Sequence, residues 1–513
     1  MLRSQKIVDI KTASTNFHRL TKPRVEYKHL CYFAASLLFL PSFSLRVVLA
    51  EVEANAASQK EHASKSHPGV NSQKSDFQAA LSAYQAQRYA DAQRRLRPLI
   101  AESPNSFEIN ELAGLVYVAL GEDERATAYL QRAVRLQPKS AAAVTTLAAN
   151  LARLHRDSEA EVHFRKGVEL DPGSYGANHN LGEFYVQTGR LAQAIPYLQH
   201  AQGINPDDYN NSYDLALAYE QTGNLDQARV QLEQLIKIHD TAELHDLLGE
   251  VAEKSRNYLL SVAQYEQAAR KDPSESNIFD WGVELLLHQA FEPALAVFKA
   301  GIERYPRSPR LETGLGIALY GLGRFDESAS ALCRASDLDP SDPLPLVFLG
   351  KNYDNFSTSA LEEIRSRMQR SVSSGLPSAA IRYFYAMGLW KLLQEQPGTA
   401  TDAEIESLLK SAIALDPVYA DAYLQLGIVY TTQRRHGEAI DQYQRALKID
   451  PGNAAAHYRL GQALARAGDN TGAQKEFSEF ERLRKQQVSD DQKQDASIQQ
   501  FVYTMRNSGA SAR

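Results

Sequence analysis

The chain has 513 residues, of which 43% are hydrophobic and 23% are charged, and its formal net charge is −6. These values exclude a polytopic membrane protein, and they lack the bulk basic character that is typical of nucleic-acid binding. Two cysteines, Cys31 and Cys333, exclude a disulfide framework and a thiolate-rich metal site.

The N-terminal segment has the three parts of a secretory signal. Residues 1–28 carry seven Lys or Arg side chains, an apolar run follows at 30–45, and small residues precede a polar stretch that begins at Glu51. We expect residues 1–50 to be a signal peptide or, alternatively, an uncleaved N-terminal anchor. Both alternatives leave the basic flank in the cytoplasm and export the rest. Cys31 lies at the front of the apolar run, which disfavours a lipoprotein.

A linker and then a repeated pattern follow. Residues 51–74 are rich in Ser, Ala, Lys and Gln and are predicted to form a flexible linker. Beyond them, prolines recur at Pro104, Pro138, Pro172 and Pro206, each 34 residues after the last, and the series resumes at Pro273, Pro306, Pro340, Pro417 and Pro451. A fixed period of this length indicates a repeat architecture.

Equivalent positions of the repeats carry the same kinds of residue. The clearest are Leu181, Gly182, Tyr185, Ala194 and Pro206 in one repeat, Leu426, Gly427, Tyr430, Ala439 and Pro451 in another, and Leu315 with Gly316 in a third. Leu and Tyr four residues apart place an apolar stripe on a first helix, and the small residue beside the Leu allows close helix packing. Gly189, Gly223, Gly323 and Gly468 are expected to end first helices at positive φ, and the prolines mark the ends of second helices.

This pattern resembles the tetratricopeptide repeat family, whose motif is W-x2-L-G-x2-Y, then A-x3-F, Ala and Pro. The resemblance covers roughly residues 75–484. It implies an all-α fold, a right-handed superhelical solenoid of about 11–12 helix-turn-helix units. We interpret the chain as an exported bacterial member of this family.

The period is disturbed in two places, and these set the predicted domain boundaries. Thr241 is assigned to the place of a missing proline, and insertions interrupt the repeats between Pro340 and Pro417. The insertions are expected on exposed turns, although such joints also change solenoid curvature or add a contact. The predicted segments are a first part of the array at 75–341, irregular units at 342–416, last units with a capping helix at 417–488, and a disordered tail at 489–513.

No catalytic motif occurs in the sequence. The chain lacks H-E-x-x-H, P-loop, G-x-S-x-G and C-x-x-C patterns. About 75 residues precede the array and about 30 follow it, which is too few for a separate catalytic domain. We therefore predict that the protein is not an enzyme, and that it uses no cofactor and binds no metal.

The resemblance implies that ligands bind a concave groove lined by the first helices. The residues expected to face this groove are His179, Glu183, Tyr213, Leu217, Glu220, Asp246, Glu250, Glu253, Phe279, Val283, Ile317 and Tyr320. The acids from Glu220 to Glu253 form a predicted acidic stretch, and the residues from Phe279 to Tyr320, with Leu286, form a predicted apolar stretch. The hypothesis is that this groove binds an extended protein segment with basic and apolar side chains, and the alternative is that the acids are a solvated face.

The predicted function is a non-catalytic interaction scaffold or adaptor outside the cytoplasm, periplasmic or secreted, with or without a tether to the inner membrane. Its expected partners are one or more proteins, and no nucleic acid. The alternative is a glycan-binding or polysaccharide-export subunit, in which Tyr213, Phe279 and Tyr320 would stack on sugars.

Overall fold

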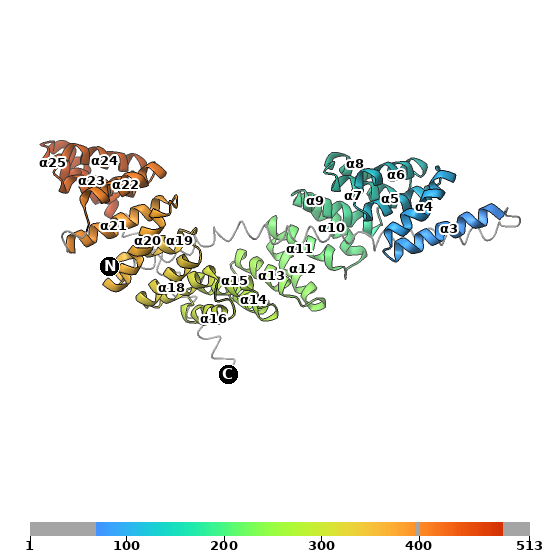
Figure 1. Ribbon diagram of the computed structural model, residues 1–513, viewed down its shortest axis with the longest axis horizontal. Coiled ribbons are helices and arrows are strands. Elements are labelled where there is room, and N and C mark those ends of the chain that lie inside the picture. Colours follow the sequence, from blue (N-terminus) through green and yellow to red (C-terminus); the bar gives the residue numbers. More distant parts are fainter. Residues whose placement is uncertain (1–67, 396–399, 486–513) are drawn as a thin grey trace. The chain divides into compact units, whose positions relative to one another are not determined.

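The computed structural model describes residues 68–395 and 400–485 (Figure 1). The described elements are α-helices and one short 3₁₀ helix, which confirms the all-α fold class. The predicted signal or anchor at 1–50, most of the linker and the predicted tail at 489–513 lie outside the described residues. Helix α3 begins at Pro68, so residues 68–74 of the predicted flexible linker are helical. Proline suits a helix start, because its missing N–H would have no partner there.

The described residues belong to two compact units that divide between Asn257 and Tyr258. The helices of the first unit are α3 (Pro68–Gln85), α4 (Tyr89–Glu102), α5 (Phe107–Ala119), α6 (Asp123–Leu136), α7 (Ala141–Arg153), α8 (Asp157–Leu170), α9 (Tyr175–Gln187), α10 (Leu191–Ile204), α11 (Tyr209–Gln221), α12 (Leu225–Ile238) and α13 (Ala242–Lys254). Odd-numbered helices are the first helices of the repeats, and even-numbered helices are the second helices.

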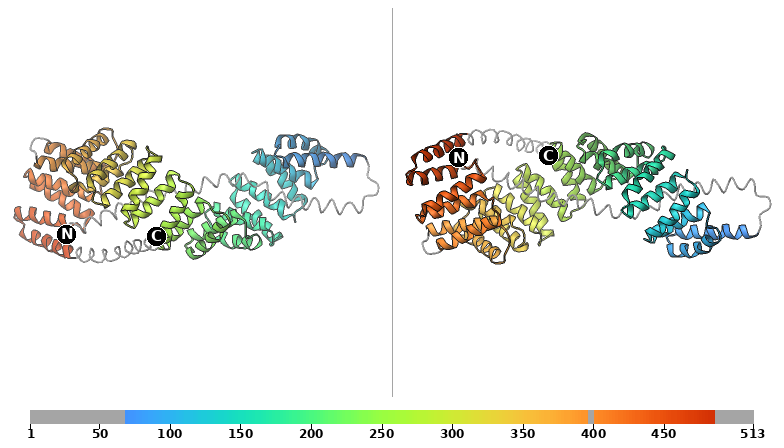
Figure 2. Two further views of the ribbon diagram at one scale, coloured as in Figure 1. Left: turned by 90° about the horizontal axis from the view of Figure 1, so that it is seen from below. Right: turned by 90° about the horizontal axis from the view of Figure 1, so that it is seen from above.

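The second unit continues the same alternation (Figure 2). Its helices are α14 (Tyr258–Lys271), α15 (Glu275–Leu287), α16 (Phe291–Arg304), α17 (Pro309–Gly321), α18 (Phe325–Leu338), α19 (Leu344–Lys351), α20 (Thr358–Ser373), α21 (Ala379–Glu395), α22 (Asp402–Leu415), α23 (Ala420–Thr432), α24 (His436–Ile449) and α25 (Ala454–Arg466). Residues 470–485 are also helical. None of the helices described here combines the length and hydropathy of a membrane span.

Each repeat is a helical hairpin that packs on its neighbours. Figure 1 shows the hairpin of α5 and α6 beside that of α7 and α8. Helix α7 contacts its own second helix, the preceding second helix α6, and the first helices α5 and α9. Because every hairpin buries its apolar face against the next, each unit is a solenoid.

A polar side chain begins nearly every first helix of the first unit. The side-chain oxygens of Ser106, Ser140, Ser174, Asp208 and Thr241 accept a hydrogen bond from the backbone N–H three residues later. Such N-caps satisfy a backbone donor that has no partner within the helix. Assigning Thr241 to the place of a proline was therefore wrong, because this residue belongs to the N-cap series.

The small positions of the first helices permit close packing. A Cβ added to Gly182 would lie 2.6 Å from a Leu198 methyl carbon, and one added to Gly316 would lie 2.5 Å from Leu332 Cγ. The larger repeat residues are buried: Leu181, Tyr185, Ala194, Leu315, Leu426, Tyr430 and Ala439. The repeated positions of the sequence are thus the contact positions of the hairpins.

A set of side-chain contacts recurs across repeat boundaries in both units. The Tyr185 hydroxyl donates to Glu161 Oε1 at 2.9 Å, and Arg190 Nη1 donates to Glu161 Oε2 at 2.6 Å. The Arg190 guanidinium also lies 4.7 Å from the centre of the Tyr185 ring. At the same sequence spacing, the corresponding contacts join Glu406, Tyr430 and Arg435 at 3.2, 2.8 and 4.0 Å.

The turns between first and second helices require a positive φ. Gly189, Gly223, Gly323 and Gly468 have φ of 71°, 80°, 76° and 87°, as the sequence predicts. In other repeats the same conformation falls on non-glycine residues, among them His155 at 55° and Arg434 at 62°. This conformation brings Cβ too close to a carbonyl oxygen, so it costs an L-residue about 1–2 kcal/mol.

We expect His155→Gly and Arg434→Gly each to raise the free energy of unfolding by about 0.5–1 kcal/mol, because relief of the backbone strain exceeds the added entropy of the unfolded chain. Urea denaturation measures the change. The control is Gly323→Ala, which should lower the free energy of unfolding by about 1 kcal/mol at an equivalent turn. Equal midpoints for all three variants and the parent would contradict the assignment of strain.

The irregular repeats contain a shortened first helix. Helix α19 has eight residues and leads into a 3₁₀ helix at Tyr353–Asn355. The Asn352 side chain donates to the Phe348 carbonyl at 2.8 Å and accepts from the Tyr320 hydroxyl at 2.6 Å. A side chain that takes a helical carbonyl competes with the next helical turn. The second helix predicted from Leu361, Ile364, Met368 and Val372 is present as α20.

Candidate functional site

The first helices α9, α11 and α13 form a surface of one charge sign, which we call the acidic first-helix face. Together they carry seven carboxylates and one lysine. The carboxylates are Glu183, Asp214, Glu220, Glu243, Asp246, Glu250 and Glu253, and the lysine is Lys254. A surface with one sign of charge concentrates ligands of the opposite sign.

Side-chain hydrogen bonds connect these first helices. His179 Nδ1 lies 3.2 Å from Asn211 Oδ1, which links α9 to α11. The Tyr209 hydroxyl donates to Glu243 Oε2 at 3.1 Å, which links α11 to α13. The Tyr175 ring stacks on the His179 ring with centroids 5.4 Å apart. The face is therefore held in place by contacts between repeats.

The centre of the face has an accumulation of negative charge. Burial raises the pKa of Asp214 well above its ordinary value, and the charges of Glu183 and Asp208 add to this. Burial and the neighbouring Glu243 carboxylate raise the pKa of the Tyr213 hydroxyl. His179, Glu183, Tyr213 and Asp214 are all half-buried, so part of each side chain reaches solvent.

The predicted acidic stretch is partly neutralised. Glu220 is 3% exposed, and its carboxylate pairs with the Lys254 ammonium, which also lies 2.9 Å from Glu250 Oε1. Burial and the Glu250 charge raise the pKa of Glu220, and Lys254 opposes this shift. Two of the four acids of that stretch are thus tied to a cation, while Asp246 and Glu253 lie half-buried on α13.

The predicted apolar stretch does not face solvent, so the expectation of an apolar groove was wrong. Phe279 is 1% exposed and lies under the Arg310 guanidinium, 3.9 Å from the ring centre, and Tyr320 is 2% exposed among Phe325, Phe348 and Phe356. The other buried members are Leu217, Val283, Leu286 and Ile317.

Helical spacing gives the direction of a side chain but does not say what covers it. Ten of the 13 residues of α17 are buried, because α15, α16 and α18 all contact this helix. The predicted acidic and apolar stretches also belong to different units.

Sequence reasoning missed Tyr175, Tyr209, Asp214 and Glu243. Two signals were available. Tyr175 and Tyr209 lie 34 residues apart, so they occupy the same repeat position, and neither α9 nor α11 contains a Lys or Arg. An acidic helix without its usual basic neighbours is unusual for a solvated surface.

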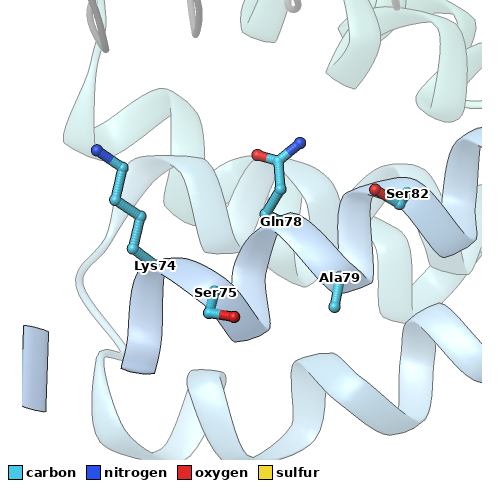
Figure 3. Close-up of a pocket in the computed structure, with 5 residues that line it drawn as sticks. All are labelled: Lys74, Ser75, Gln78, Ala79 and Ser82. Carbon is cyan, nitrogen blue, oxygen red and sulfur yellow. The ribbon is translucent and has the colours of Figure 1, made fainter. Parts of the chain in front are cut away.

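A second feature is a hollow beside α3. Figure 3 shows its lining residues Lys74, Ser75, Gln78, Ala79 and Ser82 on successive turns of that helix. They are small or flexible, and no buried charge or aromatic ring lies among them, so this hollow lacks the convergent polar groups of a ligand site. In the part of the chain that the structure describes, no group of His, Cys, Asp and Glu has the arrangement of a metal site.

The stacked hairpins and their small contact positions define a class of protein, the α-solenoid of helix-turn-helix repeats. Tetratricopeptide repeat models match residues 77–141, 187–251 and 279–343, and a further TPR repeat model matches residues 433–468. The chain is therefore a tetratricopeptide repeat protein.

Related proteins match only parts of the chain. A tetratricopeptide repeat and J domain-containing co-chaperone of Cryptococcus neoformans is 36% identical over 73 residues, which are 14% of either protein. A peroxisomal targeting signal receptor of Debaryomyces hansenii is 26% identical over 204 residues, or 38% of this chain and 32% of the receptor. The chain thus spans a third or less of these curated relatives. The solved structure of Naa15/Naa10 bound to HypK-THB aligns with 80% of this chain and 68% of its own at 16% identity and a TM-score of 0.35.

Proposed function

We propose that this protein is a non-catalytic scaffold that acts outside the cytoplasm and holds an extended segment of a partner protein on the acidic first-helix face. The observation that carries the proposal is the charge of this face, seven carboxylates against one lysine over three successive first helices. The basic and apolar pattern of residues 1–50 supports export. One relative is itself a receptor for a targeting signal, which supports binding of a protein segment.

Site-specific photocrosslinking tests the binding face. A photoreactive amino acid replaces Gln187, an exposed residue of α9 whose side chain donates to Glu183 Oε1 at 3.1 Å. The control position is Val162, which is 65% exposed on the second helix α8. In the native host we expect a discrete protein adduct from position 187 and none from position 162. Equal adducts from both positions, or none from either, would contradict the proposal.

A β-lactamase fusion tests export in the same strain. The full chain fused to β-lactamase should confer ampicillin resistance on a Gram-negative host, because the enzyme protects only outside the cytoplasm. The matched control lacks residues 1–50 and should leave the host sensitive. Sensitivity with the full chain would exclude the extracytoplasmic part of the proposal, while the crosslinks would still report on the binding face.

The glycan-binding alternative has little support from the aromatic side chains. Phe279 and Tyr320 are buried, and Tyr213 is half-buried beside Glu243. Sugar stacking needs an exposed ring face, so these three residues do not form a stacking platform. The crosslinking experiment also addresses this alternative, because recovery of polysaccharide in place of a protein adduct would favour it.

A further inference from the structure

Asp214 is a half-buried carboxyl group without a compensating cation. It lies in the second turn of α11, and all the interactions that shift its pKa are burial and the charges of Glu183 and Asp208. Burial of a carboxylate is unfavourable unless a cation or hydrogen-bond donors accompany it. The folded chain itself therefore leaves a cationic group missing at this point.

The neighbouring carboxylates already have partners within the chain. Asp208 caps α11 by accepting from the Asn211 N–H at 2.9 Å, and Glu243 accepts from the Tyr209 hydroxyl. Glu183 accepts from Gln187 Nε2 at 3.1 Å. These donors carry no charge, so they orient the carboxylates without cancelling the negative potential around Asp214.

The only lysine of the three helices is already used. Lys254 lies at the end of α13 and pairs with Glu220 and Glu250. Helices α9 and α11 contain no Lys or Arg. The cation that complements Asp214 must therefore come from outside these helices.

We infer that Asp214 is a specificity-determining residue, which selects partner segments by receiving one Lys or Arg side chain between α9 and α11, with Glu183 as the second carboxylate. This inference rests on the proposed function and assigns the chemistry of the bound segment, a basic one. The partner's cation is attracted by two carboxylates at once and displaces little, because no cation of the scaffold competes for them. The apolar side chains expected from the sequence have no exposed counterpart here.

Peptide binding to the full-length protein tests this inference. The probe is the fluorescein-labelled peptide Gly-Ser-Arg-Gly-Lys-Gly-Ser, and its control has glutamate in place of both basic residues. Fluorescence anisotropy at 50 mM salt should detect the basic probe and not the acidic one. Asp214→Asn keeps the shape of the side chain and should weaken binding of the basic probe about tenfold, whereas Glu233→Gln on the second helix α12 should leave it unchanged.

A stability measurement separates specificity from structure. Because Asp214 lacks a cation, Asp214→Asn should raise the thermal midpoint at pH 7 while it weakens binding. No binding of the basic probe, equal binding by Asp214→Asn and the parent, or a lower thermal midpoint of that variant would each overturn the inference. None of these results touches the proposed function, which the crosslinks from position 187 test separately.

Discussion

Replacing Phe298 by alanine is expected to lower the free energy of unfolding of the second unit by about 3–5 kcal/mol. Phe298 lies on the second helix α16 and is fully buried. Its ring occupies the space left by two glycines: a Cβ on Gly282 of α15 would lie 2.5 Å from a ring carbon, and one on Gly314 of α17 would lie 2.3 Å from another. One ring therefore fills the contact between two first helices.

A double-mutant cycle makes this prediction specific. Gly314→Ala alone should also destabilise the unit, because Gly282 limits the movement of the ring on its other side. Combined with Phe298→Leu, the same substitution should cost less than the sum of the two single changes, since the smaller side chain leaves room for the added methyl group. Urea denaturation measures all four proteins. Leu338→Ala, at an exposed position of α18, is the control and should change stability by less than about 0.5 kcal/mol. Additive losses would contradict the packing described here.

The second large effect is expected for Lys254→Met, which removes the cation shared by Glu220 and Glu250. Breaking a buried ion pair costs about 3–5 kcal/mol, because one charge stays buried without a partner. Since Lys254 is itself 41% exposed, we expect a loss of about 2 kcal/mol at pH 7.5. Lys237→Met, at an exposed position of α12, is the matched control and should be near neutral.

This loss should depend on pH. The folded-state pKa of Glu220 is already raised by burial and by Glu250, and loss of Lys254 raises it further. A carboxyl group whose pKa is higher in the folded state destabilises the protein above that pKa and has no effect below its unfolded pKa, about 4.3. The difference between Lys254→Met and the parent should therefore be largest at pH 7.5 and nearly vanish at pH 4. A difference that is independent of pH would exclude the ion pair as its cause.

The fold could be predicted from sequence because its signals are local and repeated. Gly182, Gly316 and Gly427 mark the close contacts, and the prolines mark helix ends, at one fixed period. A single misplaced residue, such as Thr241, does not alter such a pattern. The two-unit division had no comparable signal, because the division between Asn257 and Tyr258 falls inside an otherwise regular repeat.

The candidate site could be predicted only in part. The acidic character of α11 and α13 follows directly from their sequences, and His179 and Glu183 were assigned to the face that carries them. Exposure was predicted poorly, since the burial of Phe279 and Tyr320 depends on side chains from other repeats, Arg310 and Phe348 among them. Asp214 was missed because its importance lies in what does not surround it, which no motif records.

The paired contacts of Glu161 with Tyr185 and Arg190 have a consequence for how the array can change. The glutamate belongs to one repeat, and the tyrosine and arginine belong to the next, 24 and 29 residues later. A repeat that is duplicated or moved therefore carries half of one junction and half of another, and it fits only where the complementary halves flank it. Glu406, Tyr430 and Arg435 supply such a matching pair of halves. Exchange of modules between these two places preserves both junctions, whereas insertion elsewhere leaves an acid or a base without its counterpart.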